Sequence, residues 1–130
     1  MQYGLLAAGV ILGFSAASSI HTNSPGRESW IMGAGNLSCA QFVQMYEGDP
    51  SLIEKISFSW TQGFMSAANQ AAIAASTQPV NLVPEEWPVR SQMAFIRDYC
   101  ASNPSNAYAV AALKLFEQLR AATSDSGFPR

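Results

Sequence analysis

Histidine occurs once in these 130 residues, as His21, and cysteine occurs twice. A Ser-His-Asp or Cys-His site requires a positioned histidine, and a zinc site requires three or four ligands. No Cys-x-x-Cys motif is present, which excludes a thioredoxin-like redox site. His21 falls in a stretch rich in Ser, Gly, Asn and Pro, so we expect a solvated tail residue. The sequence therefore predicts a protein that is not an enzyme and holds no metal or other cofactor.

Charged residues are also scarce. They make up 12% of the chain, with seven Lys and Arg against nine Asp and Glu, for a net charge of −2. No basic block or basic helix face is present, so the electrostatic footprint of a nucleic-acid-binding protein is missing. A surface with few charges and many small residues favours a protein partner instead. A second copy of the chain is one candidate.

The first 19 residues resemble an export signal. Residues 3–19, YGLLAAGVILGFSAASS, are apolar or small and carry no charge. The run Leu5 to Phe14 fits the apolar region of a signal peptide, and Ala17-Ser18-Ser19 fits a small-residue cleavage site. We expect cleavage and a periplasmic or secreted protein. An uncleaved membrane anchor facing the periplasm and an ordinary core segment are the alternatives.

Export would place the two cysteines in an oxidising compartment. In an oxidising compartment an even number of cysteines indicates a disulfide, here Cys39–Cys100. Closing a loop of roughly 60 residues stabilises a domain by about 4 kcal/mol in the chain-entropy model. Two separate buried thiols are the alternative.

The rest of the chain predicts an all-α fold, a small bundle of about four helices in residues 38–122. Apolar residues recur at helical spacing in several segments, and no segment alternates with period two for long enough to propose a strand. We expect helices over 38–46, 51–76, 89–102 and 104–122. We expect residues 20–37 to be flexible and then turn, and residues 123–130 to fray.

Four apolar faces accompany these helices. The predicted inward residues are Cys39, Phe42, Val43 and Tyr46; then Ile53, Ile56, Trp60, Phe64, Ala67 and Ala71; then Val89, Met93, Ile96 and Cys100; then Tyr108, Ala112, Leu115 and Leu119. Ser38 is expected to cap the first helix. Gly63 costs the second helix about 1 kcal/mol relative to alanine, so we expect close approach of another helix there.

The connections carry their own signals. Residues 77–88 hold three prolines and must form a loop, from which Trp87 is expected to fold back on the core. Asn103-Pro104 indicates that one helix ends and the next begins here, with Asn103 as the cap of the second helix and Pro104 at its first position. For Asp98 we expect a structural ion pair or a cap.

Three stretches together resemble a family of small exported bacterial proteins. They are Gly33-Ala34-Gly35-Asn36-Leu37-Ser38-Cys39, Trp60-Thr61-Gln62-Gly63-Phe64 and Asp98-Tyr99-Cys100-Ala101-Ser102-Asn103-Pro104. Their order and spacing over residues 32–120 resemble periplasmic helical proteins similar to the acid-stress chaperone HdeA and to the immunity proteins of type VI secretion amidase effectors. The chain departs from these relatives in lacking a second cysteine pair and in its low charge.

The resemblance implies that Cys39 and Cys100 bond and join the first helix to a later one. It also implies that Trp60 and Gly63 lie in the packed centre of the middle helix. The leading hypothesis is an exported protein-binding module, an inhibitor or immunity factor, with residues 47–51 and 77–88 as contact loops. The alternatives are a structural subunit of an envelope assembly, anchored by residues 1–19, and an HdeA-like acid-stress chaperone.

Overall fold

A computed structural model describes residues 30–125, and the expectations for residues 1–29 and 126–130 lie outside this part. The described chain forms a 3-10 helix, η1 (Gly33–Asn36), and four α-helices. These are α1 (Cys39–Gly48), α2 (Pro50–Ala74), α3 (Val89–Ser102) and α4 (Tyr108–Asp125). No strand occurs among residues 30–125, so the predicted all-α class is confirmed.

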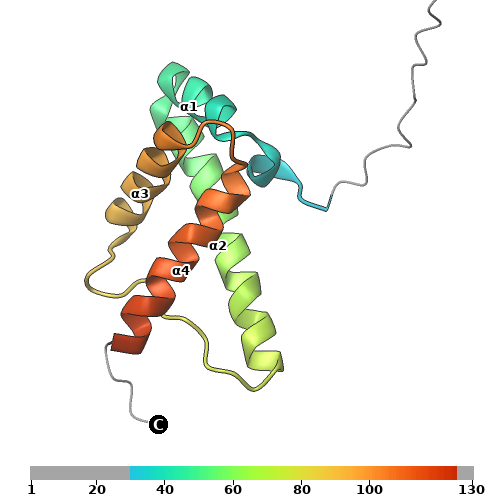
Figure 1. Cartoon of the computed structure of the whole chain (residues 1–130), viewed down its shortest axis with the longest axis vertical. Coiled ribbons are helices and arrows are strands. Elements are labelled where there is room, and N and C mark those ends of the chain that lie inside the picture. The colour runs from blue at the N-terminus through green and yellow to red at the C-terminus, as the bar shows by residue number, and fades with distance from the viewer. Residues whose placement is uncertain (1–29, 126–130) are drawn as a thin grey trace, which may run out of the picture.

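The longest helix, α2, runs along the length of the molecule, and α1 lies across its upper end (Figure 1). α1 contacts both α2 and α3, and α4 contacts both α2 and α3. Residues 75–88 leave the lower end of α2, pass the lower part of α4 and reach the start of α3 (Figure 1). None of the helices between residues 30 and 125 has the length and hydrophobicity needed to cross a membrane.

The start of α1 is tied to the connection between α3 and α4. Ser38 caps α1 as predicted: its side chain accepts from the Gln41 backbone N–H, and the Gln41 side chain accepts in return from the Ser38 N–H. The next two N–H groups, of Cys39 and Ala40, donate to the carbonyls of Asn106 and Pro104. The first turn of α1 therefore has partners for donors that helix starts otherwise leave unsatisfied.

The same contacts overturn the expected helix start at Pro104. Residues 104–107 form a turn, and α4 begins only at Tyr108. The carbonyls of Pro104 and Asn106 accept from α1, and the Tyr108 N–H donates to the Leu37 carbonyl at 2.8 Å. In a continuous helix from Pro104 these backbone groups would pair with one another. Here they pair instead with the residues that lead into α1, and Ser38 and Ala107 form an isolated antiparallel bridge.

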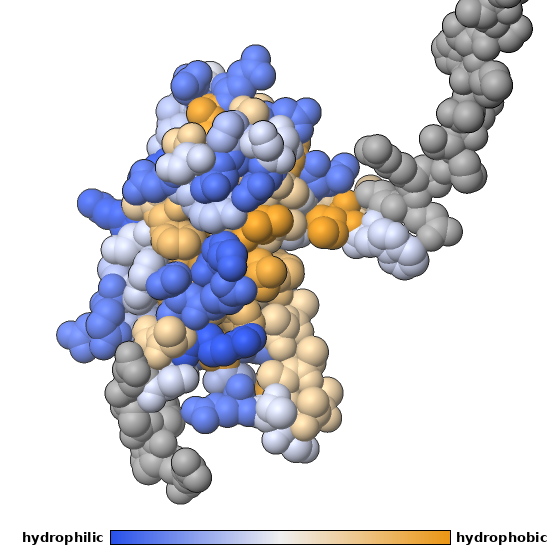
Figure 2. Space-filling model, viewed as in Figure 1, coloured by the Kyte–Doolittle hydropathy of each residue, from blue (hydrophilic) through white to orange (hydrophobic). Residues whose placement is uncertain are grey.

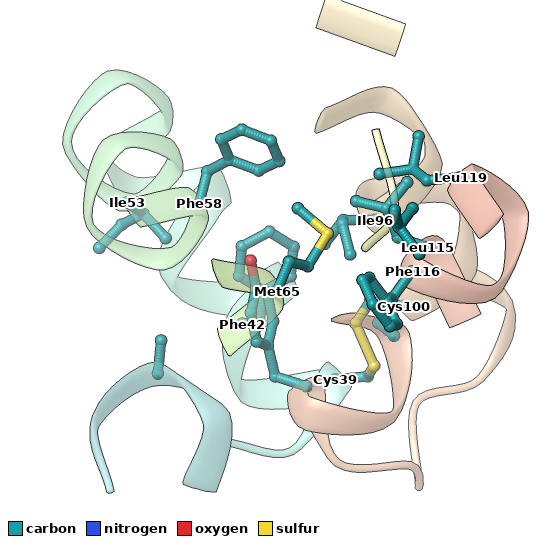
Figure 3. Packing of buried hydrophobic residues seen from close by; sticks show 14 residues of the cluster. Cys39, Phe42, Ile53, Phe58, Met65, Ile96, Cys100, Leu115, Phe116 and Leu119 are labelled. Atoms are coloured by element: carbon teal, nitrogen blue, oxygen red, sulfur yellow. A yellow bond between two sulfur atoms is a disulfide. The ribbon is translucent and has the colours of Figure 1, made fainter. Parts of the chain in front are cut away.

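The predicted disulfide is present. Cys39 at the start of α1 is bonded to Cys100 in α3, and both residues are completely buried (Figure 3). Around the disulfide lies one apolar core, to which all four helices contribute. Its fully buried members besides the cysteines include Met65, Ile96, Tyr108, Leu115 and Leu119.

The short connection between α1 and α2 is not a loop of five residues. Only Asp49 lies outside a helix, and its side chain accepts from the Leu52 N–H to cap α2, with Pro50 at the first position. The expected contact loop at 47–51 is therefore a tight helix–helix junction.

Two polar side chains, those of Asn69 and Gln92, hold the proline-rich connection between α2 and α3. Asn69 pairs with both backbone groups of Val80, at 2.8 and 2.9 Å. Gln92, which is 1% exposed, donates to the carbonyls of Leu82 and Trp87. Trp87 is partly buried against the core and meets Phe95 edge-on at 5.7 Å, so the prediction that it folds back is confirmed.

The predicted inward face of α4 is confirmed, since Tyr108, Ala112, Leu115 and Leu119 are all buried. The helix does not fray at residue 123, however. Thr123 is buried, donates to the Leu119 carbonyl and accepts from the Asn81 N–H, so the helix continues to Asp125.

Loss of the disulfide should cost a large part of the stability. We expect the Cys39→Ala/Cys100→Ala double variant to unfold with a free energy about 4 kcal/mol lower than that of the oxidised protein, out of a total of about 5–15 kcal/mol. Urea titration followed by circular dichroism measures the difference. Adding a reductant should destabilise the native protein and leave the double variant unchanged; equal stability of the two oxidised samples would contradict the role of the bond.

Candidate binding surface on α2

The buried face of α2 differs from the one predicted by its apolar residues. Ser57, Thr61 and Met65 are buried, whereas Ile56 is 54% exposed and Trp60 and Phe64 are only partly covered. The buried positions follow the predicted ones by one residue, which corresponds to a rotation of about 100° around the helix. Of the expected inward residues only Ile53 is buried, and Ala67 and Ala71 are exposed.

The rotation leaves an apolar stripe of α2 that the described chain covers only in part. We call it the α2 apolar face, and it consists of Leu52, Ile56, Trp60, Gly63, Phe64, Ala67, Ala71 and Ala74. Its large side chains lie in the first half, where Leu52 is 51% exposed, and its second half carries only small ones apart from Phe64. In Figure 2 the surface formed by the lower half of α2 is largely pale orange, the colour of weakly apolar residues.

Trp60 anchors this face against η1. A Cβ on Gly35 would lie 2.1 Å from Trp60 Cζ2, and one on Gly33 would lie 3.2 Å from Trp60 Cδ1. Ala34 and Gly35 are buried, so the turn expected at the end of residues 20–37 is a 3-10 helix packed on the core. Gly35 is required because the indole occupies the space of its missing side chain. Gly33 is further favoured by its φ of 67°.

Apolar surface continues on both sides of Trp60. Phe64 stacks on it with 5.7 Å between ring centroids, and Ile31 approaches Gly35 next to the indole. The adjoining Trp30 and Met32 are 86% and 71% exposed. The α2 apolar face and residues 30–32 together form an exposed patch of a kind that typically marks an interaction site.

Gly63 does not have the role that was predicted for it. It lies exposed in the middle of the α2 apolar face, and nothing in the described chain comes within 4 Å of the position its Cβ would take. Within the described chain the expected close approach of another helix is therefore not made. The helix carries the cost of a glycine without an intramolecular contact that requires one.

The patch is also electrically neutral. From Ile56 to Pro84 the sequence contains no Asp, Glu, Lys, Arg or His. The charged residues nearest in sequence are Glu54, which pairs with Arg97 of α3 on the other side of the helix, and Lys55. A partner of this surface would therefore be recognised through shape and apolar contact rather than through charge.

A buried hydrogen bond behind the face holds the rotation of α2. Tyr108 Oη and Thr61 Oγ1 lie 3.0 Å apart, and Thr61 Oγ1 donates to the Ser57 carbonyl. With the Thr61 proton on the Ser57 carbonyl, neutral Tyr108 donates to Thr61, whereas an ionised Tyr108 would accept the Thr61 proton instead. Burial raises the pKa of Tyr108 to about 12, the hydrogen bond to Thr61 opposes this rise, and the negative charge of Glu54 adds to it.

Other predicted site residues lie apart from this face. Tyr99 stacks on Phe95 and its hydroxyl accepts from Asn106, close to the α3–α4 turn. Asp98 is exposed and takes part in neither of the two ion pairs found within residues 30–125, so its predicted ion pair is not formed. No group of three His, Cys, Asp or Glu side chains in the same part of the chain could hold a metal ion.

Comparisons of the chain with family models, curated proteins and solved structures find no match. The geometry of the described residues therefore carries the functional argument. Reasoning from hydrophobic residues alone missed the buried polar set Ser57, Thr61 and Gln92. Spacing could not separate the two faces, because Ser57, Thr61 and Met65 repeat at four residues just as Ile56, Trp60 and Phe64 do.

Two glycine-to-alanine substitutions should have opposite effects. Gly63→Ala should raise the free energy of unfolding by about 1 kcal/mol, because the added methyl group meets nothing and alanine favours the helix. Gly35→Ala should lower it by about 1–3 kcal/mol, because its Cβ would overlap the Trp60 ring. Chemical unfolding of both variants measures this contrast, and equal effects would contradict the assigned environments.

The pKa of Tyr108 predicts a loss of stability in alkali. An unfolded tyrosine ionises near 10, whereas folded Tyr108 holds its proton to about 12, so the folded state is favoured fully below pH 10 and loses this advantage as pH rises to about 12. Relative to Tyr108→Phe, the native protein should lose about 2–3 kcal/mol across that range. Parallel unfolding curves for the two proteins from pH 9 to 12 would contradict the assignment.

Proposed function

We propose that this chain is an exported, non-enzymatic protein-binding module and that the α2 apolar face is its binding surface. The observation that carries the proposal is the mismatch on α2, where polar Ser57 and Thr61 are buried while Ile56 and Leu52 are exposed. The same helix already buries Ile53, Phe58 and Met65 in its own core, so Leu52 and Ile56 are apolar residues that this core does not use. A second protein that covers the α2 apolar face accounts for the exposed apolar residues as well as for the buried polar ones.

Placing the contact on α2 differs from the expectation that residues 47–51 and 77–88 form it. The first of these segments is a helix junction, and the second is fastened to α2, α3 and α4 through Asn69, Gln92 and Thr123. The α2 apolar face instead lies on a single helix of 25 residues.

Export to the periplasm is supported by the disulfide together with the signal-like residues 1–19. A fully buried bond between α1 and α3 suits an oxidising compartment, where such bonds persist. The finer proposal of an inhibitor or immunity factor is supported by the resemblance carried by Gly33 to Cys39, Trp60 to Phe64 and Asp98 to Pro104. A stapled scaffold with one rigid apolar face would suit a factor that blocks another protein.

A matched pair of charge substitutions tests the proposal. Gly63→Glu places a carboxylate in the middle of the α2 apolar face, where it meets nothing in the folded chain. Gln62→Glu places the same charge on an exposed neighbour about 100° around the helix. Both variants should fold, and circular dichroism checks this first.

The readout is retention of periplasmic protein by the tagged, natively exported chain after crosslinking. We expect the native chain and Gln62→Glu to retain the same partner, and Gly63→Glu to retain at least about tenfold less, because burying an unpaired charge is costly. Recovery of no partner by the native chain, or equal recovery by Gly63→Glu, would contradict the proposal.

A further inference from the structure

We propose that the protein that occupies the α2 apolar face is a second copy of this chain, packed antiparallel about a two-fold axis at Gly63. This inference rests on the proposed function, namely that the face binds protein, and it names the partner. Three features of the face support it: the distribution of large and small residues, the absence of charge, and an exposed glycine that nothing in the chain explains.

The first feature is a size gradient along the helix. On the α2 apolar face, Leu52 and Ile56 before Gly63 are about half exposed, while Ala67, Ala71 and Ala74 are the exposed residues after it. Ile73 is 58% exposed but lies about 80° around the helix from Gly63, to one side of this face. In an antiparallel pair centred on Gly63, a residue a given number of positions before Gly63 lies opposite the residue the same number after it. Large side chains of each copy therefore meet small side chains of the other, as well-packed helix pairs require.

The register gives Ile56 a specific place to bind. It lies seven residues before Gly63, opposite Gln70 of the other copy. The four exposed or half-exposed positions around that point are Ala67, Gln70, Ala71 and Ala74. Four residues spaced in this way form a hole that accepts one side chain of a facing helix. The two-fold axis repeats the contact, so each copy supplies one Ile56 and one hole.

The second feature is the neutrality of the face. In this pair the residues at the level of Gly63 lie close to their own copies, so a charge there would be repelled by an identical charge. No residue from Ile56 to Pro84 is charged. Lys55 lies to one side of the face, and Glu54 is paired with Arg97 on the side toward α3. Self-association meets no electrostatic penalty along this helix.

The third feature is Gly63 itself. A glycine inside a helix costs about 1 kcal/mol, and here no atom of the described chain uses the space it leaves. At the crossing point of two helices the missing side chain lets the backbones approach closely. The crossing therefore gives Gly63 the packing role that is missing within one copy.

Cysteine crosslinking tests both the axis and the direction of the pair, using the natively exported, disulfide-closed protein. We expect Gly63→Cys to form a disulfide with its own copy across the axis. A mixture of Ser59→Cys and Ala67→Cys should form the mixed 59–67 crosslink, because these positions lie at the same level. Neither variant alone should crosslink, because its two copies would be separated by about 12 Å along the helices.

Analytical ultracentrifugation of the native chain measures whether it forms a dimer in solution. We expect its mass to rise to twice the monomer value with concentration. Gly63→Glu should raise the dissociation constant at least about tenfold, while Gln62→Glu should leave it nearly unchanged. A dimer unaffected by Gly63→Glu, or 59–59 crosslinking in a parallel pair, would overturn the inference.

A monomer at every concentration would also overturn it. The native monomer could still capture a different periplasmic protein that the Gly63→Glu variant fails to capture. In that case the proposed function would stand, with another protein as the partner. If it captured none, both proposals would fail.

Discussion

The backbone junction around the Cys39–Cys100 disulfide is the constraint on which the rest of the structure depends. At this point the start of α1, the end of α3 and the start of α4 meet, joined by one covalent bond and by three backbone hydrogen bonds from Cys39, Ala40 and Tyr108. The N–H groups of Cys39 and Ala40 at the start of α1 donate to carbonyls in the turn that precedes α4. These bonds also place Tyr108 in the middle of the core, where it is 1% exposed.

The position of Tyr108 in turn determines how α2 is rotated. Its hydroxyl bonds to Thr61, and its ring meets both Phe42 and Trp60. Satisfying this buried hydroxyl draws the Ser57–Thr61 side of α2 inward and turns the Trp60–Phe64 side toward η1 and the solvent. The exposure of the α2 apolar face thus accompanies the pairing of the buried Tyr108 and Thr61 hydroxyls, each of which would be costly to leave unpaired in the core.

Most of the fold could be predicted from local signals, because those signals act within one helix. Ser38, the Gly48-Asp49-Pro50 break and the prolines of 77–88 locate the helix ends, and α3 begins and ends where expected. The rotation of α2 could not be predicted, because it depends on Tyr108, 47 residues away in the sequence. The late start of α4 likewise depends on bonds to α1 that local sequence does not reveal. The α2 apolar face was hidden for the same reason: its residues were assigned to the core.

Methionine oxidation tests the rotation of α2 most directly, because Met65 immediately follows Phe64 and would be exposed if the Trp60–Phe64 stripe faced inward. Met65 is 1% exposed in the structure, while Met45 is 44% and Met32 is 71% exposed. After mild peroxide treatment of the folded protein, peptide mass spectrometry should find Met32 and Met45 oxidised and Met65 intact. Oxidation of Met65 as fast as that of Met45 would show that α2 buries its apolar stripe, and the account of the binding face would be wrong.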